Sequence, residues 1–482
     1  MTDHALSDLR RRVSSALGPD TDRVLGPAPG HANVSGFAPR DTLAVLRPTR
    51  AEQVSAVLRA LDDADAPSLY AVSTGRNWGL GSREPVEGGA VRLELHGLDR
   101  VRRVDTDAGW AVIEAGVTQR QLSEQLAGTG RMLNVTASSA HTSVLGNALD
   151  RGVGLRRQRV HDLVGLEVVL PGGEVARVGW WPGDGGGAPN PHGLGPSLLH
   201  LFTQSDLGVA VAGVVRLPVR PEVQRVLRLT FGPADLGAAV DTFRRWQGQG
   251  LFQGVLKVYD TTSASSYGTS DSSGYLAHLS VGGTAESVEA LLAVLAAEAE
   301  AAKVFTSVRR SDQDPPEPSD VVSRVVEAGY AGDVSHHEEM LRSAVGQGAA
   351  DVDTRGGGWI FFLPLVPYTG RDVTAALALL DQVHARTGLR PGATVNALDP
   401  DVVDLVVSLR FDRSDADETG RAHRGLELLH ESFASAGYLP YRLDVDHASR
   451  ADLLGDPASR TLTRTIRAAL DPRGVIARGR YS

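Results

Sequence analysis

The chain has 482 residues, of which 42% are hydrophobic and 22% charged, and this is the composition of an ordinary globular protein. A chain of this length exceeds one compact core, so two or three domains are expected. The net charge of −9 gives no footprint for nucleic acid, and the lack of cysteine excludes disulfides, thiolate metal sites and a cysteinyl cofactor bond.

Membrane and export signals are also missing from the pattern. No apolar run approaches the roughly 18 residues that suggest a membrane span. Residues 1–18 carry charges where a signal peptide needs an apolar core. We therefore expect a cytoplasmic protein with no membrane partner.

The first half of the chain predicts alternating strands and helices. Thr49 and Glu52 have the spacing of a capping box before a helix, and Thr118 and Gln121 repeat that device. Residues 163–179 predict a hairpin about a Pro-Gly-Gly turn. Further strands are predicted over residues 67–73, 88–95, 109–116 and 207–219.

The pattern changes after residue 221. Strands are predicted over residues 223–231, 251–259, 275–281, 356–366 and 402–413, with a long Ala-rich helix over 286–303. This order is typical of an α+β domain in which helices back an antiparallel sheet. We expect residues 1–222 to form one domain, 223–438 an inserted domain, and 439–482 a segment that returns to the first.

A glycine-rich loop, "YAVSTGRNWGLGS" at residues 70–82, follows the predicted strand directly. Successive backbone N–H groups in such a loop can form an anion-binding concavity, although turn geometry alone also selects glycine. The sequence lacks a G-x-G-x-x-G fingerprint that opens a helix, a Walker loop and a G-x-S-x-G elbow.

A second loop, "TSVLGNALDRGVG" at residues 142–154, again combines glycines with small polar residues. The ordered motifs "VLRPTRAEQVSAVL", "STGRNWGLGS", "SVLGNALDRGVG", "GLEVVLPGGEV", "LFTQSDLGVAVAGVVRLP" and "ALDPRGVIARGRYS" resemble the vanillyl-alcohol oxidase / p-cresol methylhydroxylase flavoprotein family. The resemblance runs from about residue 40 to the end and is loose over 222–430.

The resemblance implies an α+β fold in which a two-subdomain FAD-binding domain of the p-cresol methylhydroxylase type carries an inserted substrate (cap) domain. It also implies an FAD-dependent oxidoreductase that takes a hydride from a C–H of a small alcohol or phenolic substrate to flavin N5. The electron acceptor is then O₂ or another compound, and a homodimer is possible. Two alternatives remain open: a hydroxy-acid oxidase, and a non-redox protein or cyclase that uses FAD as a scaffold.

By the same resemblance, the two loops, one strand and the C-terminal end hold FAD. The implied cofactor-binding residues are Ser73, Thr74, Gly75, Arg76, Asn77, Trp78, Gly79, Leu80, Ser143, Gly146, Asn147, Gly152, Val209, Trp359 and Arg480. Trp359 stands where covalent members carry a linking His or Tyr, and residues 75–79 contain no histidine. We therefore expect non-covalent FAD.

Three residues are implied near the substrate. Tyr441 and Arg442 match a Tyr–Arg pair that can stabilise an oxyanion as hydride leaves a neighbouring carbon. Leu80 replaces a further tyrosine of the phenol-oxidising members, which leaves the phenolic substrate open. Asp162 matches an acidic position near the flavin, with pairing to Arg156 or Arg159 as the structural alternative.

Histidines give weaker signals. His336 and His337 are neighbours in sequence and point to different faces of a helix, so no metal site is predicted there. His161 could accept a proton from a substrate hydroxyl, although a surface position is the alternative. His447 lies beyond the Tyr–Arg pair and has no assigned role.

Overall fold

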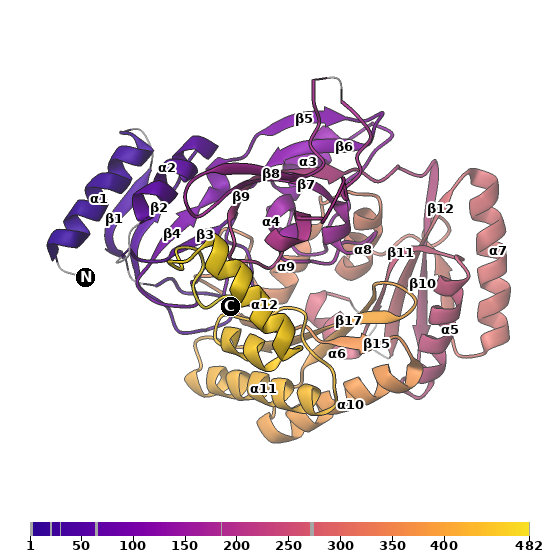
Figure 1. Cartoon of the computed structure of the whole chain (residues 1–482). Coiled ribbons are helices and arrows are strands. Elements are labelled where there is room, and N and C mark those ends of the chain that lie inside the picture. Colours follow the sequence, from indigo (N-terminus) through magenta and orange to yellow (C-terminus); the bar gives the residue numbers. More distant parts are fainter. Residues whose placement is uncertain are drawn as a thin grey trace.

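The computed structural model describes residues 3–19, 22–28, 30–62, 66–184, 186–269 and 274–481, and these form three β-sheets (Figure 1). Two smaller sheets come from the first half of the chain, and one larger sheet comes from the second half. The mixed helices and antiparallel sheets confirm the predicted α+β class.

The first sheet has the strand order β1-β2-β4-β3, in which β2, β4 and β3 are parallel and β1 is antiparallel. The second has the order β5-β6-β9-β7-β8 and is antiparallel throughout. Their bounds are β1 Arg23–Ala28, β2 Thr42–Leu46, β3 Leu69–Val72, β4 Ala90–Glu94, β5 Val101–Asp105, β6 Trp110–Glu114, β7 Leu163–Val169, β8 Val175–Gly179 and β9 Val209–Arg216. The predicted hairpin is the β7–β8 pair.

Helix starts in this half follow local capping chemistry, with one shift. Helix α3 (Gln119–Gln125) begins at Thr118, whose hydroxyl accepts from Gln121 N at 3.3 Å, as predicted. The prediction for α2 (Ala51–Leu61) was wrong by one residue, because the N-cap is Arg50 and not Thr49. The Gln53 side chain accepts the backbone N–H groups of both Thr49 and Arg50, so it replaces Glu52 as the reciprocal partner. The remaining helices here are α1 Asp3–Leu17 and α4 Val144–Leu149.

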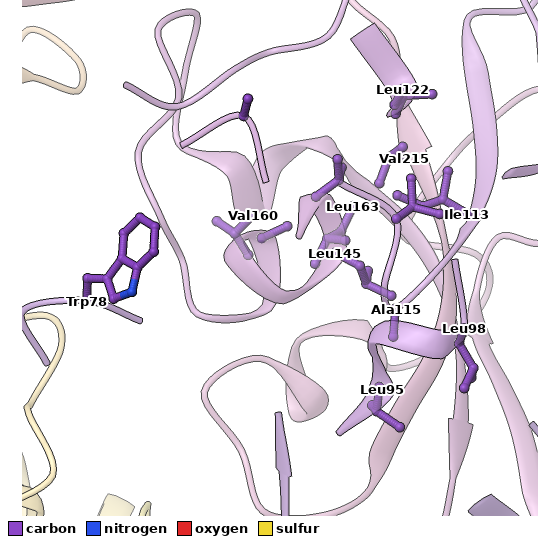
Figure 2. Close-up of a cluster of buried hydrophobic side chains, with 14 of the residues drawn as sticks. Trp78, Leu95, Leu98, Ile113, Ala115, Leu122, Leu145, Val160, Leu163 and Val215 are labelled. Atoms are coloured by element: carbon purple, nitrogen blue, oxygen red, sulfur yellow. The ribbon is translucent and has the colours of Figure 1, made fainter. Parts of the chain in front are cut away.

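The core of this half lies against the second sheet (Figure 2). Ile113 of β6, Leu145 of α4 and Leu122 of α3 are fully buried. Trp78 of the first glycine loop belongs to the same cluster and is 7% exposed. The indole therefore fixes the loop to the core, since displacing a buried aromatic ring exposes a large apolar area.

The third sheet, called the cap sheet here, has the order β13-β10-β12-β11-β16-β17-β14, with β15 also paired to β17. All its pairings are antiparallel. Its bounds are β10 Val223–Phe231, β11 Gln253–Tyr259, β12 Tyr275–Gly283, β13 Ser307–Arg310, β14 Gly358–Phe362, β15 Leu365–Pro367, β16 Gly392–Ala397 and β17 Val402–Phe411.

Helices cover both faces of the cap sheet. On the outer face, Phe243 of α5 contacts Phe231, and Phe433 of α11 contacts Phe362. Helices α6 and α8 pack on the inner face, which also looks toward the first half (Figure 1). The helices are α5 Leu236–Gly248, α6 Thr261–Tyr267, α7 Ala285–Ala302, α8 Val321–Tyr330, α9 His337–Val345, α10 Gly370–Thr387 and α11 Ala416–Ser435.

The C-terminal segment returns to the first sheet after α12 (Pro457–Leu470). Leu69 N donates to Val475 O at 2.6 Å, and Ala477 N donates to Leu69 O at 2.8 Å, so the segment lies alongside β3. This pairing brings Arg480 next to the first glycine loop. Among the described helices, none combines the length and apolar character needed to cross a bilayer.

Candidate active site

A cavity of about 400 Å³ lies between the two glycine loops and the inner face of the cap sheet. Its volume is in the range of cofactor and small-molecule sites. Most residues singled out in the sequence line it: Ser73, Thr74, Gly75, Arg76, Asn77, Trp78, Leu80, Ser143, Gly146, Asn147, Gly152, Val209, Trp359, Tyr441, Arg442 and Arg480. Gly79 and Asp162 are not among its lining residues.

The two glycine loops touch each other at one end of the cavity. Ser143 N donates to the Thr74 hydroxyl at 3.2 Å, and Ser143 Oγ donates to Ala115 O at 2.7 Å. A Cβ on Gly146 would lie 2.3 Å from Ser73 Oγ and 3.0 Å from Ser73 Cβ, so a side chain here would require Ser73 to move. The prediction of a loop over residues 142–154 was wrong for its centre, because Val144–Leu149 form helix α4 and Ser143 Oγ caps its start by accepting from Gly146 N at 2.9 Å. Residues of both glycine-rich segments line the same cavity.

Gly79 joins the first loop to the cap sheet. Its carbonyl accepts from Phe361 N at 3.0 Å, and its φ is +81°. A Cβ here would lie 2.1 Å from the Phe361 ring, so glycine is required for this close approach. The structure thus places Gly79 behind the cavity wall, where it positions neighbours that face the cavity.

The polar residues of the first loop bond to the second half of the chain. Arg76 Nη1 donates to Ala349 O at 2.6 Å, and Trp78 Nε1 donates to Asp353 Oδ2 at 3.2 Å. Arg76 is therefore part of a contact between the two halves of the chain.

Arg480 supplies an unpaired positive charge to the cavity. It is 6% exposed, and its Nη1 has no hydrogen-bond partner among the described residues. Its guanidinium carbon lies 5.3 Å from the centre of the Tyr481 ring. A buried guanidinium with a free donor is suited to an anionic group, and the diphosphate of FAD is such a group.

Tyr441 and Arg442 line the cavity. The positive charge of Arg442 is matched by Asp150, a residue that the sequence did not suggest. Arg442 Nε donates to Asp150 Oδ2 at 3.1 Å, and the two side chains form a close ion pair. Arg442 Nη2 also reaches Asn77 Oδ1 at 3.4 Å. The backbone of Tyr441 is fixed by Gln204 Nε2, which donates to its carbonyl at 2.8 Å. Burial raises the pKa of the Tyr441 phenol, so its hydroxyl keeps its proton and can donate it in a hydrogen bond.

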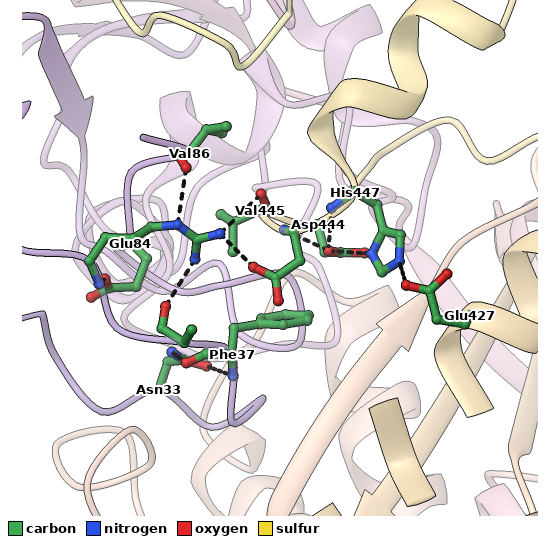
Figure 3. Close-up of polar contacts among 11 residues, drawn as sticks. Asn33, Phe37, Glu84, Val86, Glu427, Asp444, Val445 and His447 are labelled. Atoms are coloured by element: carbon green, nitrogen blue, oxygen red, sulfur yellow. Dashed lines mark hydrogen bonds and ion pairs between the residues drawn. The ribbon is translucent and has the colours of Figure 1, made fainter. Parts of the chain in front are cut away.

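The chain just after this pair is pinned by a polar network (Figure 3). His447 Nδ1 lies 2.8 Å from Asp444 Oδ1, and its Nε2 lies 2.8 Å from Glu427 Oε1. Burial acts to raise the pKa of Asp444, but hydrogen bonds from His430 and His447 outweigh it and hold that pKa well below its usual value. His447, unassigned from sequence, thus orders the segment that carries the Tyr–Arg pair.

Three ligand-type side chains of this network lie close together. Ligand atoms of His430, Asp444 and His447 lie within 4.8 Å of one another. Both ring nitrogens of His447 already have carboxylate partners, so hydrogen bonding accounts for the arrangement. His337 is buried with its Nε2 at 2.7 Å from Thr136 O, while His336 faces Glu339.

Asp162 lies in a buried network away from the cavity lining. Arg157 Nε donates to Asp162 Oδ1 at 2.6 Å, and Asn134 Nδ2 donates to Oδ2 at 2.7 Å. Arg159 Nε lies 3.7 Å from Oδ2. Arg159 is one of the two partners expected, and Arg157 takes the place of Arg156, which donates to Tyr330 O instead. These contacts favour the structural alternative over a catalytic role. His161 beside it is exposed, as the alternative for that residue expected.

A polar row on the inner face of the cap sheet also lines the cavity, and sequence reasoning missed it. Lys257 pairs in register with Asn396, and Asn396 pairs with Asp404. Lys257 Nζ donates to Asn396 Oδ1 at 2.6 Å, and Asn396 Nδ2 donates to Asp404 Oδ2 at 3.2 Å. Burial lowers the pKa of Lys257 to about 8 and raises that of Asp404 to about 6. The sequence feature that could have revealed this row is a lysine among the apolar residues of a predicted strand.

The comparisons with known proteins agree with this geometry. Residues 42–179 match the family model described as an FAD binding domain. The chain is 30% identical to 1'-carboxy-chondrochloren decarboxylase of Chondromyces crocatus, with 91% of this chain and 90% of that protein covered. It is 28% identical to the 4-cresol dehydrogenase [hydroxylating] flavoprotein subunit of Pseudomonas putida, with 91% and 87% covered.

Solved structures show the same fold. Substrate-bound p-cresol methylhydroxylase superposes with a TM-score of 0.88 at 23% identity, over 100% of this chain and 97% of the other. The 4-ethylphenol oxidase of Gulosibacter chungangensis, in an isoeugenol complex, gives 0.87 at 21%, over 100% and 98%.

The fold and the cavity define a flavoprotein oxidoreductase whose cofactor is FAD. The chain belongs to the vanillyl-alcohol oxidase / p-cresol methylhydroxylase family. The residues present fit that cofactor, because both glycine-rich segments line one cavity and Arg480 brings to it a buried charge without an ion-pair partner among the described residues.

Proposed function

We propose that this protein oxidises a small alcohol or phenolic substrate, and that a hydride leaves a substrate C–H next to the Tyr441–Arg442 pair. The observation that carries the proposal is the single cavity lined by the FAD-type glycine loops and by this pair. When bound, FAD supplies the acceptor for the hydride at N5, and O₂ or another acceptor then reoxidises it.

The protein's own residues bind and orient. The loops around Gly75 and Gly146 hold the cofactor's diphosphate and ribityl chain through backbone groups, with Arg480 as counter-ion. The Tyr441 hydroxyl and the Arg442 guanidinium stabilise negative charge on the substrate oxygen while the hydride departs. Asp150 and Asn77 fix the orientation of Arg442 by accepting its hydrogen bonds.

Leu80 makes the site less favourable for a phenolate substrate. This side chain lines the cavity and offers no hydrogen bond where the phenol-oxidising members have a tyrosine. A phenolate oxygen therefore has one donor fewer, a loss of about 1–3 kcal/mol if it stays unpaired. The names of relatives include a cresol dehydrogenase, a decarboxylase and a glycolate oxidase subunit, so these names cover neutral and acidic substrates.

Anaerobic flavin reduction tests the proposal. The FAD-loaded protein is mixed with 4-alkylphenols and benzylic alcohols, and loss of the oxidised flavin band is followed. We expect Tyr441→Phe to slow reduction about 100-fold, the usual cost of losing one oxyanion donor. Tyr438→Phe is the matched control, because Tyr438 donates to Asp372 on the cap surface, and its rate should stay at the wild-type value.

A different result identifies the non-redox alternative. If dithionite reduces the flavin but no alcohol, phenol or hydroxy acid does, the scaffold or cyclase function replaces the oxidoreductase proposal. Equal rates in Tyr441→Phe and wild type would remove the assigned role of that hydroxyl and leave the rest intact.

We also propose that FAD is bound without a covalent bond. Trp359 lines the cavity and packs on Phe361 with ring centres 4.5 Å apart. Indole is not a linking side chain in this family, and no histidine is among the described residues that line this cavity, while His96 and His141 line a second cavity beside residues 72–76. Acid precipitation should release all flavin to the supernatant. Yellow colour kept in the pellet would show a covalent bond and direct attention to Tyr267, which adjoins Trp359.

A further inference from the structure

The inner face of the cap sheet holds a buried cation without an ion-pair partner. Lys257 is 8% exposed, and its one hydrogen bond is to the neutral amide of Asn396. None of the described carboxylates forms an ion pair with it. The ammonium also lies 5.6 Å from the centre of the Tyr259 ring. An ammonium group carries three donors, so a single hydrogen bond leaves two of them without an acceptor, which is costly unless another group completes the surroundings.

Two further polar atoms on this wall lack partners among the described residues. The Tyr259 hydroxyl and Asp404 Oδ1 are both in side chains about 1% exposed, and both residues line the cavity. Tyr259 lies two residues along β11 from Lys257, so the two side chains point to the same face. The wall therefore contains one unused hydroxyl donor and one unused carboxyl oxygen, both buried beside the cavity.

The chain strongly favours arginine over lysine, yet position 257 holds a lysine. Of 49 Lys and Arg residues in the chain, only Lys257 and Lys303 are lysines. Lys303 is exposed at the end of α7, and Lys257 is the buried one. A compact ammonium serves a small anion in a narrow site better than the larger planar guanidinium.

We propose that Lys257 is the counter-ion for a carboxylate of the substrate, with the Tyr259 hydroxyl as a second donor to that carboxylate. The inference rests on the proposed function and names its substrate class: an alcohol or phenol that also carries a carboxylate. The carboxylate binds at the cap wall, and the oxidised carbon lies between this wall and the flavin position. A phosphate dianion fits less well, because one free cation matches one negative charge.

The charges around the wall support this choice. Arg442 is matched by Asp150, so it adds no free positive charge. Asp404, on the far side of Asn396 from Lys257, has its pKa raised by burial to about 6. His278 is paired with Lys257 across the sheet and is neutral, because burial lowers its pKa to about 3. Below pH 6 the wall thus carries one net positive charge.

The pH dependence follows from these charges. Between about pH 6 and 8, Asp404 ionises and the wall becomes neutral, and above about pH 8 Lys257 loses its proton. The other groups that face this pair, Tyr259 and Tyr441, keep their protons because burial raises their pKa values. Carboxylate affinity should therefore fall as the pH rises from 5 to 9.

The test compares matched ligands on the FAD-loaded protein. 4-Hydroxyphenylacetate and benzoate are titrated beside their primary amides at pH 6, with perturbation of the flavin spectrum as the readout. We expect each acid to bind about 10- to 100-fold more tightly than its amide, the range of a charged hydrogen bond. Lys257→Met should abolish the preference for the acid, while Lys303→Met, the matched control, should keep it.

Two results would overturn the inference. Equal affinity of acid and amide in the wild type, or a preference that survives in Lys257→Met, overturns the inference. A Lys257→Met variant with an altered flavin reduction potential and an unchanged preference would make Lys257 a counter-ion of the flavin. Lys257→Arg keeps the positive charge. If this variant keeps the preference for the acid that Lys257→Met loses, the loss follows from the missing charge and not from misfolding. Reduction by neutral phenols is measured separately, so the proposed function can stand if this inference fails.

Discussion

Replacing Gly79 with alanine tests whether the first glycine loop depends on close contact with the cap sheet. Two costs add at this position. The φ of +81° places an L-residue in the left-handed region, at about 1–2 kcal/mol. The new Cβ would also overlap the Phe361 ring at 2.1 Å, and such overpacking costs about 1–3 kcal/mol.

Gly250→Ala is the matched control. Its φ is +69°, and nothing lies within 4 Å of the position its Cβ would take, so it carries the backbone cost alone. We therefore expect Gly79→Ala to lose about 2–5 kcal/mol of unfolding free energy, and Gly250→Ala about 1–2 kcal/mol. Urea unfolding followed by circular dichroism measures both.

The two variants should also differ in cofactor binding. Gly79→Ala must move either the loop or the Phe361 strand, and Trp78 and Leu80 on either side of it line the cavity. We expect FAD affinity to fall at least about tenfold, which corresponds to about 1.4 kcal/mol. Gly250→Ala should bind FAD as the wild type does. If Gly79→Ala matches Gly250→Ala in both stability and FAD affinity, the proposed role of the contact is wrong.

Three further substitutions probe the surroundings of the site. Asp150→Asn leaves the Arg442 charge without its partner, and we expect a loss of about 3 kcal/mol in unfolding free energy and slower flavin reduction; unchanged values of both would contradict this. His447→Gln removes a histidine with a raised pKa. Burial lowers this pKa, but the carboxylate partners, Asp444 among them, raise it above 6.5 overall. The stabilisation by the charged imidazole is therefore present below pH 6.5 and is lost above the folded pKa. The difference in Tm between wild type and this variant should therefore be larger at pH 6 than at pH 9, and an equal difference would refute the assignment. Asp162→Asn should lower Tm and leave the rate of flavin reduction per bound FAD unchanged, whereas a large drop in that rate would restore a catalytic role.

The local signals of the sequence were sufficient for much of the fold. The box of Thr118 and Gln121 begins a helix, and the Pro-Gly-Gly turn joins β7 to β8, because capping and turn chemistry act over a few residues. The one-residue shift of the α2 N-cap from Thr49 to Arg50 also arises from local capping chemistry. Two side chains there could close the box, and Gln53 does so in the structure.

The order of the glycine motifs also identified the family and its cofactor. Glycine positions depend on backbone dihedrals and close approach, which leave a readable trace in sequence. The residues around the substrate left a weaker trace. Arg442 was found by resemblance, but its partner Asp150 lies 292 positions earlier in the chain, and no local pattern connects them.

The sequence by itself determined helix α3, the long helix α7, the β7–β8 hairpin, the first glycine loop and the class of protein, because these leave a trace in short stretches of residues. The tertiary structure alone decided the chemistry of the cap wall. Lys257 and Asn396 are 139 positions apart and become neighbours only through the register of β11 and β16. A shift of one residue in either strand would turn one of the two side chains to the other face, so the wall exists only because the strands pair as they do.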